Sequence, residues 1–291
     1  MIARRPRADA RRGHARSRPA PTVRRASARR RFAPRRALAA LTMLASGLAI
    51  YGLTASSAFG VRTVTAHGAA LTGEAAVLAA LALPTPAADG SDGSVVNVVT
   101  LETAPLAARV ATLPAVASAT VRASLPDAVE VSVVEREPIL VWATGAHRYL
   151  VDREGRILAD AAAGDATPPV AGAMAGLPVV TDARAGSGTL APGSFLDPVD
   201  LDVATRLASL APADIGSKAT RITVSVDDAT GWSLSVPAGW TAVFGIYTGT
   251  VRPPDLVPAQ VRLLRSLLAG RESRLKRAIL ASGEAGTYSL R

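Results

Sequence analysis

The stretch LPAVASATVRASLPDAVEVSVVEREP, residues 113–138, decides the fold of the first half of the chain. Small apolar residues alternate with Ser, Thr and Arg from Ala117 to Ser124, and valines alternate with polar residues from Val129 to Val133. Alternation with a period of two is typical of strands that are buried on one face, and the Leu-Pro-Asp between the two runs is a turn signal. We therefore predict a half-buried β-hairpin.

The residues before the hairpin predict the rest of a small domain. Val61–Gly68 is a candidate strand, and two amphipathic helices are expected, the first capped by Thr72 and the second opened by Thr103. A turn-rich surface loop, Pro84–Ser94, separates the two helices. A strand, two helices and a hairpin form a small α+β unit in which the helices cover one face of a three-stranded sheet.

After the hairpin, the sequence predicts a second, β-rich α+β module of antiparallel strands with flanking helices. Strands are expected at Ile139–Ala143, Tyr149–Asp152, Arg156–Ala159 and Leu177–Thr181, and in a meander spanning 222–246. One helix begins at Asp197-Pro198, and another runs from Val257 to Gly270. Most of 161–192 is dense in Ala, Gly, Pro and Asp, and we expect it to be mobile over much of its length.

A charge step marks the amino-terminal region. Residues 1–36 hold fourteen arginines and one acidic residue, a net charge of +13, whereas 37–60 hold no charged side chain. The segment Ala37–Phe59 would form a helix about 35 Å long, enough to cross a hydrocarbon core of about 30 Å. Because arginines beside a first span tend to stay cytoplasmic, we predict a single-pass membrane anchor with the amino terminus inside and residues 61–291 outside.

The same charge step has a second interpretation, a cleavable export signal. Arg29–Phe32 resembles a twin-arginine motif, and Ser56-Ser57-Ala58 could serve as a small-residue cleavage site, which would release a soluble protein. The apolar region of a signal peptide usually spans about 7 to 15 residues. The greater length of the segment found here favours an uncleaved anchor.

The chain's net charge of +10 is unevenly divided, since the tail carries +13 and the remainder therefore carries −3. We expect the tail to be disordered and solvated, and able to hold anionic lipid head groups. We do not expect it to bind nucleic acid, because Phe32 is its only aromatic residue. The chain has no cysteine, so an exported domain would depend on its hydrophobic core alone.

No catalytic, cofactor or metal site is predicted. The histidines have no second ligand at metal spacing, and the paired carboxylates lie in a first helical turn or a hairpin turn, where acids cap and are solvated. No nucleophile elbow or phosphate-binding glycine motif is present. The candidates considered are His14, His67, His147, Asp200 with Asp202, Asp227 with Asp228, and Gly186-Ser187-Gly188. We expect the chain to be no enzyme and to act by contact.

The hairpin sequence, Leu113–Arg122 and Ser124–Pro138, resembles the FtsQ-type POTRA module of the FtsQ/DivIB cell-division family. Trp142, Tyr149–Gly155 and Ile157 resemble the start of that family's second, β-rich domain. Together with the Arg-rich tail and the single span, the resemblance implies four regions. They are a disordered cytoplasmic tail (1–36), a transmembrane helix (37–59), an FtsQ-type POTRA domain (60–137) and an FtsQ/DivIB-like β domain (138–291).

The resemblance also implies a function and a site. Members of this family are non-catalytic, bitopic scaffolds at the division septum of the plasma membrane, and they gather FtsB- and FtsL-like partners through sheet-edge and POTRA contacts. Thr287–Arg291 is similar to the family's carboxy-terminal strand, although Ser289 stands in place of an acid and relatives usually continue further. We predict partner contact through Tyr288, Ser289, Leu290 and Arg291, with Tyr288 either an aromatic anchor or packed on the last helix.

Two alternatives stay open. The chain could instead be an envelope transport accessory whose POTRA module binds extended polypeptides. At the end of the hairpin, Glu135-Arg136-Glu137 either joins the two domains or is solvated, since charges that end a strand are commonly exposed. Trp142 is expected in the core near this junction.

Overall fold

The computed structural model describes residues 34–55, 59–83, 96–162, 167–187, 190–237, 239–250 and 252–291. The predictions for the tail up to residue 33 and for the whole loop Pro84–Ser94 lie outside these residues. The chain divides into two compact units, 1–50 and 51–291.

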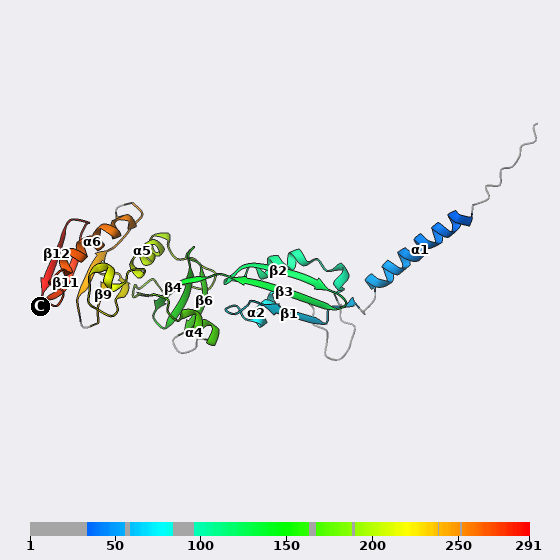
Figure 1. The fold of residues 1–291 in the computed structure, drawn as a ribbon, viewed down its shortest axis with the longest axis horizontal. Coiled ribbons are helices and arrows are strands. Elements are labelled where there is room, and N and C mark those ends of the chain that lie inside the picture. Colours follow the sequence, from blue (N-terminus) through cyan, green and yellow to red (C-terminus); the bar gives the residue numbers. More distant parts are fainter. Residues whose placement is uncertain are drawn as a thin grey trace, which may run out of the picture. The chain divides into compact units, whose positions relative to one another are not determined.

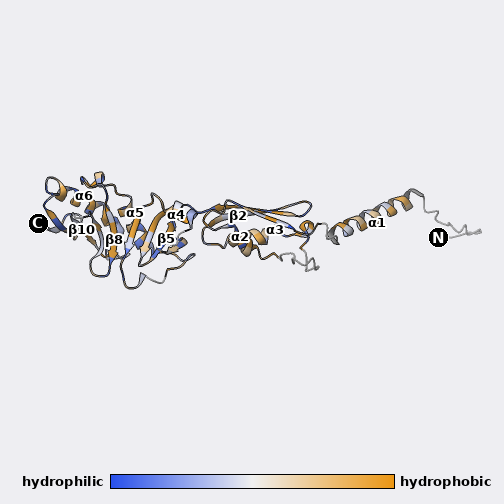
Figure 2. Cartoon of the chain, turned by 90° about the horizontal axis from the view of Figure 1, so that it is seen from below, coloured by the Kyte–Doolittle hydropathy of each residue, from blue (hydrophilic) through white to orange (hydrophobic). Residues whose placement is uncertain are grey.

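Helix α1, Pro34–Ala55, contains most of the predicted anchor. Its described side chains, 37–53, are all exposed, and Figure 2 shows hydrophobic residues along its length. Within the described part of the chain, no helix has both the length and the hydropathy needed to cross a membrane. The membrane anchor over Ala37–Phe59 is therefore not confirmed and stays a prediction.

The predicted three-stranded sheet with two helices is confirmed (Figure 1). Its elements are β1 (Thr63–His67), α2 (Glu74–Leu81), the short 3₁₀ helix η2 (Val98–Thr100), α3 (Thr103–Val110), β2 (Val116–Ser124) and β3 (Ala128–Glu135). The strand order is β1-β3-β2, with β1 parallel and β2 antiparallel to β3. Alternate valines of β3 pack with both helices, as the period of two predicts.

The first helix begins later than predicted. Gly73, not Thr72, occupies the cap position of α2. The backbone N–H of Thr72 instead donates to Oε1 of Glu135 at 2.7 Å, so the end of β3 holds this turn.

The second domain is built on one nine-stranded sheet of order β12-β11-β10-β9-β8-β7-β4-β5-β6. Its strands are β4 (Pro138–Thr144), β5 (His147–Asp152), β6 (Ile157–Ala162), β7 (Val179–Asp182), β8 (Thr223–Asp227), β9 (Gly231–Ser235), β10 (Thr241–Gly245), β11 (Leu275–Leu280) and β12 (Gly286–Leu290). Its helices are α4 (Pro168–Met174), α5 (Pro198–Ala208) and α6 (Val257–Leu268), with short 3₁₀ turns η4 (Pro212–Ile215) and η5 (Pro254–Leu256).

The prediction of antiparallel strands in this domain is wrong in part, because the sheet is mixed. The pairs β4 with β7, β7 with β8, and β10 with β11 are parallel. Parallel neighbours require a crossover connection. Helix α5 lies between β7 and β8 in sequence, and α6 lies between β10 and β11, so these helices supply two of the crossovers.

Two elements lie where none was predicted. Within 161–192, the expected strand near Leu177–Thr181 is confirmed as β7, but α4 precedes it in a segment expected to be largely mobile. Thr167 and two prolines open that helix. Strand β11 was also missed, because Lys276 and Arg277 interrupt the alternation of its apolar residues.

The core of the second domain lies mainly on one face of the sheet. There Trp142, Trp232 and Trp240 pack with residues of α5 and α6, which confirms Trp142 as a core residue. On the opposite face, α4 covers only the β4-β5-β6 end, where it packs on Val141, Leu150 and other residues of the sheet. The rest of that face carries no helix in the described structure.

Candidate partner-binding edge

Strand β12 is the last strand of the nine-stranded sheet and the predicted partner site. It pairs with β11 alone (Figure 1). All five of its residues are exposed. An edge strand presents a row of unpaired backbone N–H and C=O groups, which accept a strand from another chain.

The direction of the free backbone groups follows from one hydrogen bond. The N–H of Arg291 donates to the carbonyl oxygen of Arg274 at 2.8 Å, so it faces the β11 side. Alternate residues in an antiparallel pair direct their backbone groups to opposite sides. The N–H groups of Thr287 and Ser289 therefore also face β11, and those of Tyr288 and Leu290 face away from the sheet.

The side chains of β12 alternate between the two faces of the sheet. Tyr288 lies opposite Ala278 on the face that α6 covers, and its exposed fraction is 49%, against 45% for Leu290. Tyr288 is thus half-buried, and half of its surface is available to a partner. Ser289 lies on the other face, opposite Arg277.

Arg291, the fourth predicted site residue, makes contacts within the domain. Besides its backbone bond to Arg274, its Nη2 donates to the carbonyl oxygen of Gly239 at 2.7 Å. These bonds tie the end of β12 to the β9–β10 connection. Its side chain therefore positions the edge strand.

A buried polar cluster fixes β11, the strand that carries β12. Nη2 of Arg252 donates to the carbonyl oxygens of Phe244 and Leu280, both at 2.6 Å. Nε2 of Gln260 donates to the same two oxygens, at 3.1 and 2.6 Å. Because Phe244 lies in β10 and Leu280 ends β11, both side chains join these parallel strands.

Tyr247 completes this cluster, since its hydroxyl donates to Oε1 of Gln260 at 2.5 Å. Burial raises the pKa of Tyr247 despite the nearby Arg252, so the phenol remains a donor. The sequence analysis missed the cluster, although a signal was present. Gln260 is the one polar residue among Val257, Leu264 and Leu268 on the buried face of α6, and a polar residue at such a position requires a buried partner.

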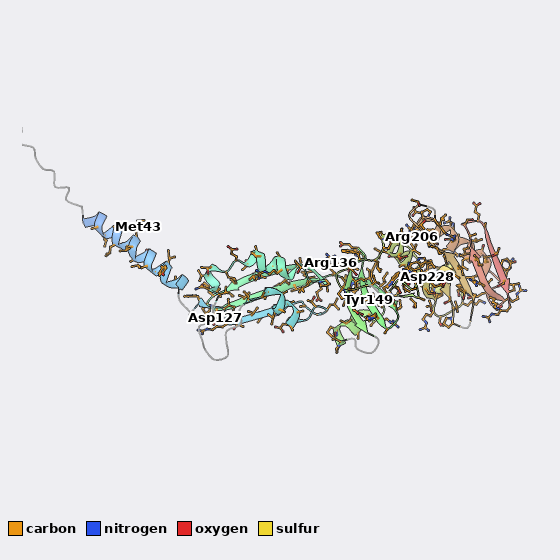
Figure 3. The ribbon with its side chains drawn as sticks, turned by 180° about the vertical axis from the view of Figure 1, so that it is seen from behind. Met43, Asp127, Arg136, Tyr149, Arg206 and Asp228 are labelled. Carbon is orange, nitrogen blue, oxygen red and sulfur yellow. The ribbon has the colours of Figure 1, made fainter. Side chains whose placement is uncertain are left out.

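Within the charged run at the end of the hairpin, Arg136 joins the two domains, as in the first of the two interpretations given above, whereas Glu137 is exposed, as in the second. Nη1 of Arg136, which Figure 3 labels, lies 3.0 Å from Oδ2 of Asp152 and 2.9 Å from Oε2 of Glu154. Hydrogen bonds to Glu154 and then Asp152 raise the pKa of Arg136. Glu135 accepts hydrogen bonds from the N–H groups of Leu71 and Thr72. Glu135 therefore holds the turn before α2, and Arg136 links the two domains.

Of the candidates for chemistry, Asp200, Asp228, Gly186 and Ser187 line one cavity, whereas His147 and Asp202 are not among its lining residues. His147 pairs with Asp160 at 2.9 Å, and Asp202 pairs with Arg206 at 2.6 Å. Asp197 is the cap of α5 and Asp200 lies in its first turn, as predicted, but Asp200 is not solvated, because it pairs with Arg184 at 2.7 Å. No three His, Asp or Glu side chains gather as a metal ion would require in the part of the chain that the structure describes.

Comparison with known proteins agrees with this architecture. Residues 59–136, which hold β1 to β3, match the family described as POTRA domain, FtsQ-type. The chain is 28% identical over 259 residues to the cell division protein FtsQ of Chloroflexus aurantiacus, covering 87% of this chain and 78% of that protein. The chain contains an FtsQ-type POTRA domain and is similar to FtsQ cell division proteins. Its likeness to a family member therefore extends beyond the POTRA domain into the β domain.

Shorter matches to other FtsQ proteins agree. The FtsQ of Mycobacteroides abscessus is 33% identical over 120 residues, which cover 41% of this chain and 35% of that protein. The FtsQ of Chloroflexus aggregans is 33% identical over 98 residues, 34% of this chain and 32% of that protein. All three FtsQ relatives are named as cell division proteins, and this chain is similar to each of them.

Proposed function

We propose that this chain is a non-catalytic scaffold of the cell division machinery that holds a partner by adding the partner's strand to β12. The observation that carries the proposal is the open edge, where the N–H groups of Tyr288 and Leu290 face away from the sheet. The half-exposed ring of Tyr288 adds an aromatic contact beside the edge. Similarity to FtsQ cell division proteins supports the role in division.

The partner in this proposal is a membrane-bound division protein that supplies an extended segment. The resemblance to the FtsQ/DivIB family implies FtsB- and FtsL-like proteins. Main-chain hydrogen bonds would provide much of the affinity, and pockets for alternate side chains would provide specificity. The fixed cluster of Arg252 and Gln260 keeps β11 in place, so the edge is preorganised.

The proposal includes a single membrane anchor over Ala37–Phe59, with the amino terminus in the cytoplasm and the folded domains outside. The absence of charge from 37 to 60 and the exposed apolar side chains of α1, such as Leu41 and Met43, support it. Lipid would cover these side chains, and the arginine-rich tail would lie against anionic head groups.

A pair of proline variants tests the edge. Leu290→Pro removes an N–H that faces away from the sheet, and it should abolish capture of the partner while leaving thermal stability nearly unchanged. The matched control, Ser289→Pro, removes an N–H that faces β11 and should lower stability. Partner pull-down from solubilised membranes is the measurement, and unchanged capture by Leu290→Pro would refute the edge.

A fluorescent fusion in depleted cells tests the role itself. Midcell bands in rescued cells, and filaments without rescue, are expected for a division scaffold. A uniform envelope signal with normal septa would support the transport alternative. Protease accessibility in spheroplasts checks orientation, because residues 61–291 should be cleaved from outside.

A further inference from the structure

One end of the POTRA domain is formed by three segments that backbone contacts hold together. Gly60, at the entry of the chain into the domain, forms a β-bridge with Asn97, which caps η2. The N–H of Arg62 donates to the carbonyl oxygen of Asp127 at 2.8 Å, and Figure 3 labels Asp127 in the β2–β3 hairpin turn. The entry end of the domain thus consists of residues 60–62, 97–99 and 125–127.

Exposed apolar side chains are concentrated at this entry end. Among the described residues of the POTRA domain, the exposed large hydrophobic side chains are Val99, Leu125 and Val134, with exposed fractions of 48%, 68% and 60%. Val99 and Leu125 belong to the entry end, whereas Val134 lies near the far end of β3, about 20 Å from the start of that strand. Removing the surface of Val99 and Leu125 from water would be favourable.

The entry end also contacts the helix that carries most of the predicted span. Nδ2 of Asn97 donates to the carbonyl oxygen of Leu53 at 3.3 Å. Leu53 belongs to α1 and precedes Phe59, the last residue of the predicted span. The chain from Phe59 to Arg62 covers at most about 10 Å. If 37–59 crosses the bilayer, the entry end therefore lies at the level of the lipid head groups.

The hairpin turn that carries Leu125 is fixed in place. The Asp127 carbonyl oxygen accepts from the N–H of Thr63 at 3.2 Å as well as from Arg62, which ties the turn to the start of β1. On either side of the turn, Ser124 pairs with Ala128 across the hairpin. A segment that is already ordered loses little conformational freedom when it binds, so this turn is preorganised for contact.

The chemistry and position of the entry end favour lipid as its partner. The bilayer interface accepts apolar side chains together with cations, and Arg62 is exposed at the same end. An arginine can lay its methylenes along apolar surface while its guanidinium reaches a phosphate group. The bilayer is favoured over a protein partner because the anchor would keep it within about 10 Å, with no separate encounter required.

We propose that the entry end is a second membrane contact, at which Leu125 and Val99 enter the lipid interface. This inference rests on the anchor over Ala37–Phe59 that belongs to the proposed function. It adds that the POTRA domain is held to the bilayer at two places, the span and the hairpin turn. The domain then cannot turn freely about its anchor, and its orientation relative to the membrane surface is restricted.

Single fluorescent labels test the contact, because the chain has no cysteine of its own. Leu125→Cys, Val134→Cys and Met43→Cys are each labelled with the fluorophore NBD in the full-length protein, in vesicles of phosphatidylethanolamine and phosphatidylglycerol. Nitroxide groups on the lipid chains quench a label that enters the bilayer. Leu125→Cys should lose at least about half of its emission, and the control Val134→Cys under about one tenth. Met43→Cys, in α1 and 79% exposed, reports on the anchor.

The three labels separate failure of the contact from failure of the anchor. Quenching of Met43→Cys without quenching of Leu125→Cys overturns the second contact and leaves the anchor in place. No quenching at either position overturns the anchor, and the inference with it. Equal quenching of Leu125→Cys and Val134→Cys also overturns the inference, since the fluorophore itself would then be entering the lipid.

A further pair of variants tests Leu125 without a label on it. With NBD on Val99→Cys, Leu125→Asp should reduce quenching by lipid nitroxide at least about twofold, because a carboxylate is costly to move into lipid. Val134→Asp, which places the same charge at the far end of β3, should leave the quenching unchanged. Thermal unfolding followed by circular dichroism checks that both variants fold. Equal quenching in the two folded variants refutes the contact by Leu125.

Discussion

The two ends of the nine-stranded sheet differ in how completely they are covered. At the β4-β5-β6 end, one face packs on the main core and the other packs on α4, and Ala115 of the POTRA domain joins the second cluster. The 193–196 segment also pairs with the start of β6, through bonds such as Ile157 N–H to the Ser194 carbonyl at 2.9 Å. At the β12 end, one face carries no helix and the edge is open. A single sheet thus has one end that joins the neighbouring domain and one that is free to take a partner.

The largest expected effect is a difference in stability loss between two leucine variants, one at each end of the sheet. Leu150→Ala, at the covered end, should lower the free energy of unfolding by about 3 kcal/mol, because Leu150 is fully buried. Leu290→Ala, at the open end, should cost less than about 1 kcal/mol, since the side chain is 45% exposed. Denaturant unfolding followed by tryptophan fluorescence reports on this domain, which holds all three tryptophans. Equal losses would contradict the difference between the ends.

A second variant tests how the open end is held. Gln260→Leu removes the donor to Phe244 and Leu280 and the acceptor of Tyr247, and it should cost about 1 to 2 kcal/mol. Hydrogen exchange should increase in β11 and β12 more than in β4 to β6. Ser266→Ala, an exposed position on the same helix, is the control. Uniform exchange across the sheet would show that the cluster does not act locally.

A third variant tests the link at the covered end. Arg136→Met should cost about 1 kcal/mol, because it leaves the largely buried Asp152 without its cation. Glu154→Gln should cost under about 0.5 kcal/mol, since that side chain is 63% exposed. The measurement is the unfolding midpoint of each variant, and a reversed order would show that Glu154 is the main partner.

The smallest expected effect is on the pH dependence of stability. It arises from Asp227 in the β8–β9 turn, which lies between the two ends of the sheet. The backbone and hydroxyl of Thr230, then the N–H of Ala229, hold the pKa of Asp227 below its usual value. The stabilisation is present above the unfolded pKa of about 3.9 and is lost as pH falls through the folded value. Asp227→Asn should therefore flatten the acid limb of stability, by less than about 1 kcal/mol because solvent screens the group. An unchanged acid limb would contradict this.

Patterns within short stretches of sequence correctly predicted several of the individual strands and helices. The hairpin at 116–135 follows from alternation, and α5 begins where Asp197-Pro198 predicts a cap and a first-turn proline. Parallel neighbours could not be predicted in this way, since β7 lies between β4 and β8 only after the chain has crossed the sheet. The pairing of Arg184 with Asp200 joins residues sixteen positions apart, so the sequence placed Asp200 in a first helical turn without indicating its cation.

The same limit applies to the predicted site. The resemblance placed Tyr288 to Arg291 in a carboxy-terminal strand, and the structure has β12 there. That Arg291 bonds back to Gly239 depends on how the β9–β10 connection meets the end of the strand. No pattern within either segment encodes that contact.

The alternation of backbone groups in β12 has an evolutionary consequence. If the partner is held by the main chain of residues 288 and 290, then substitution at these positions leaves the hydrogen-bonding groups in place, provided that no proline enters. Substitution of Ser289, whose side chain lies on the other face of the sheet, would also leave these groups in place. Orthologues could then differ in the amino acids of this strand and still bind the same partner. A low sequence identity in this strand would not by itself indicate that partner binding has been lost.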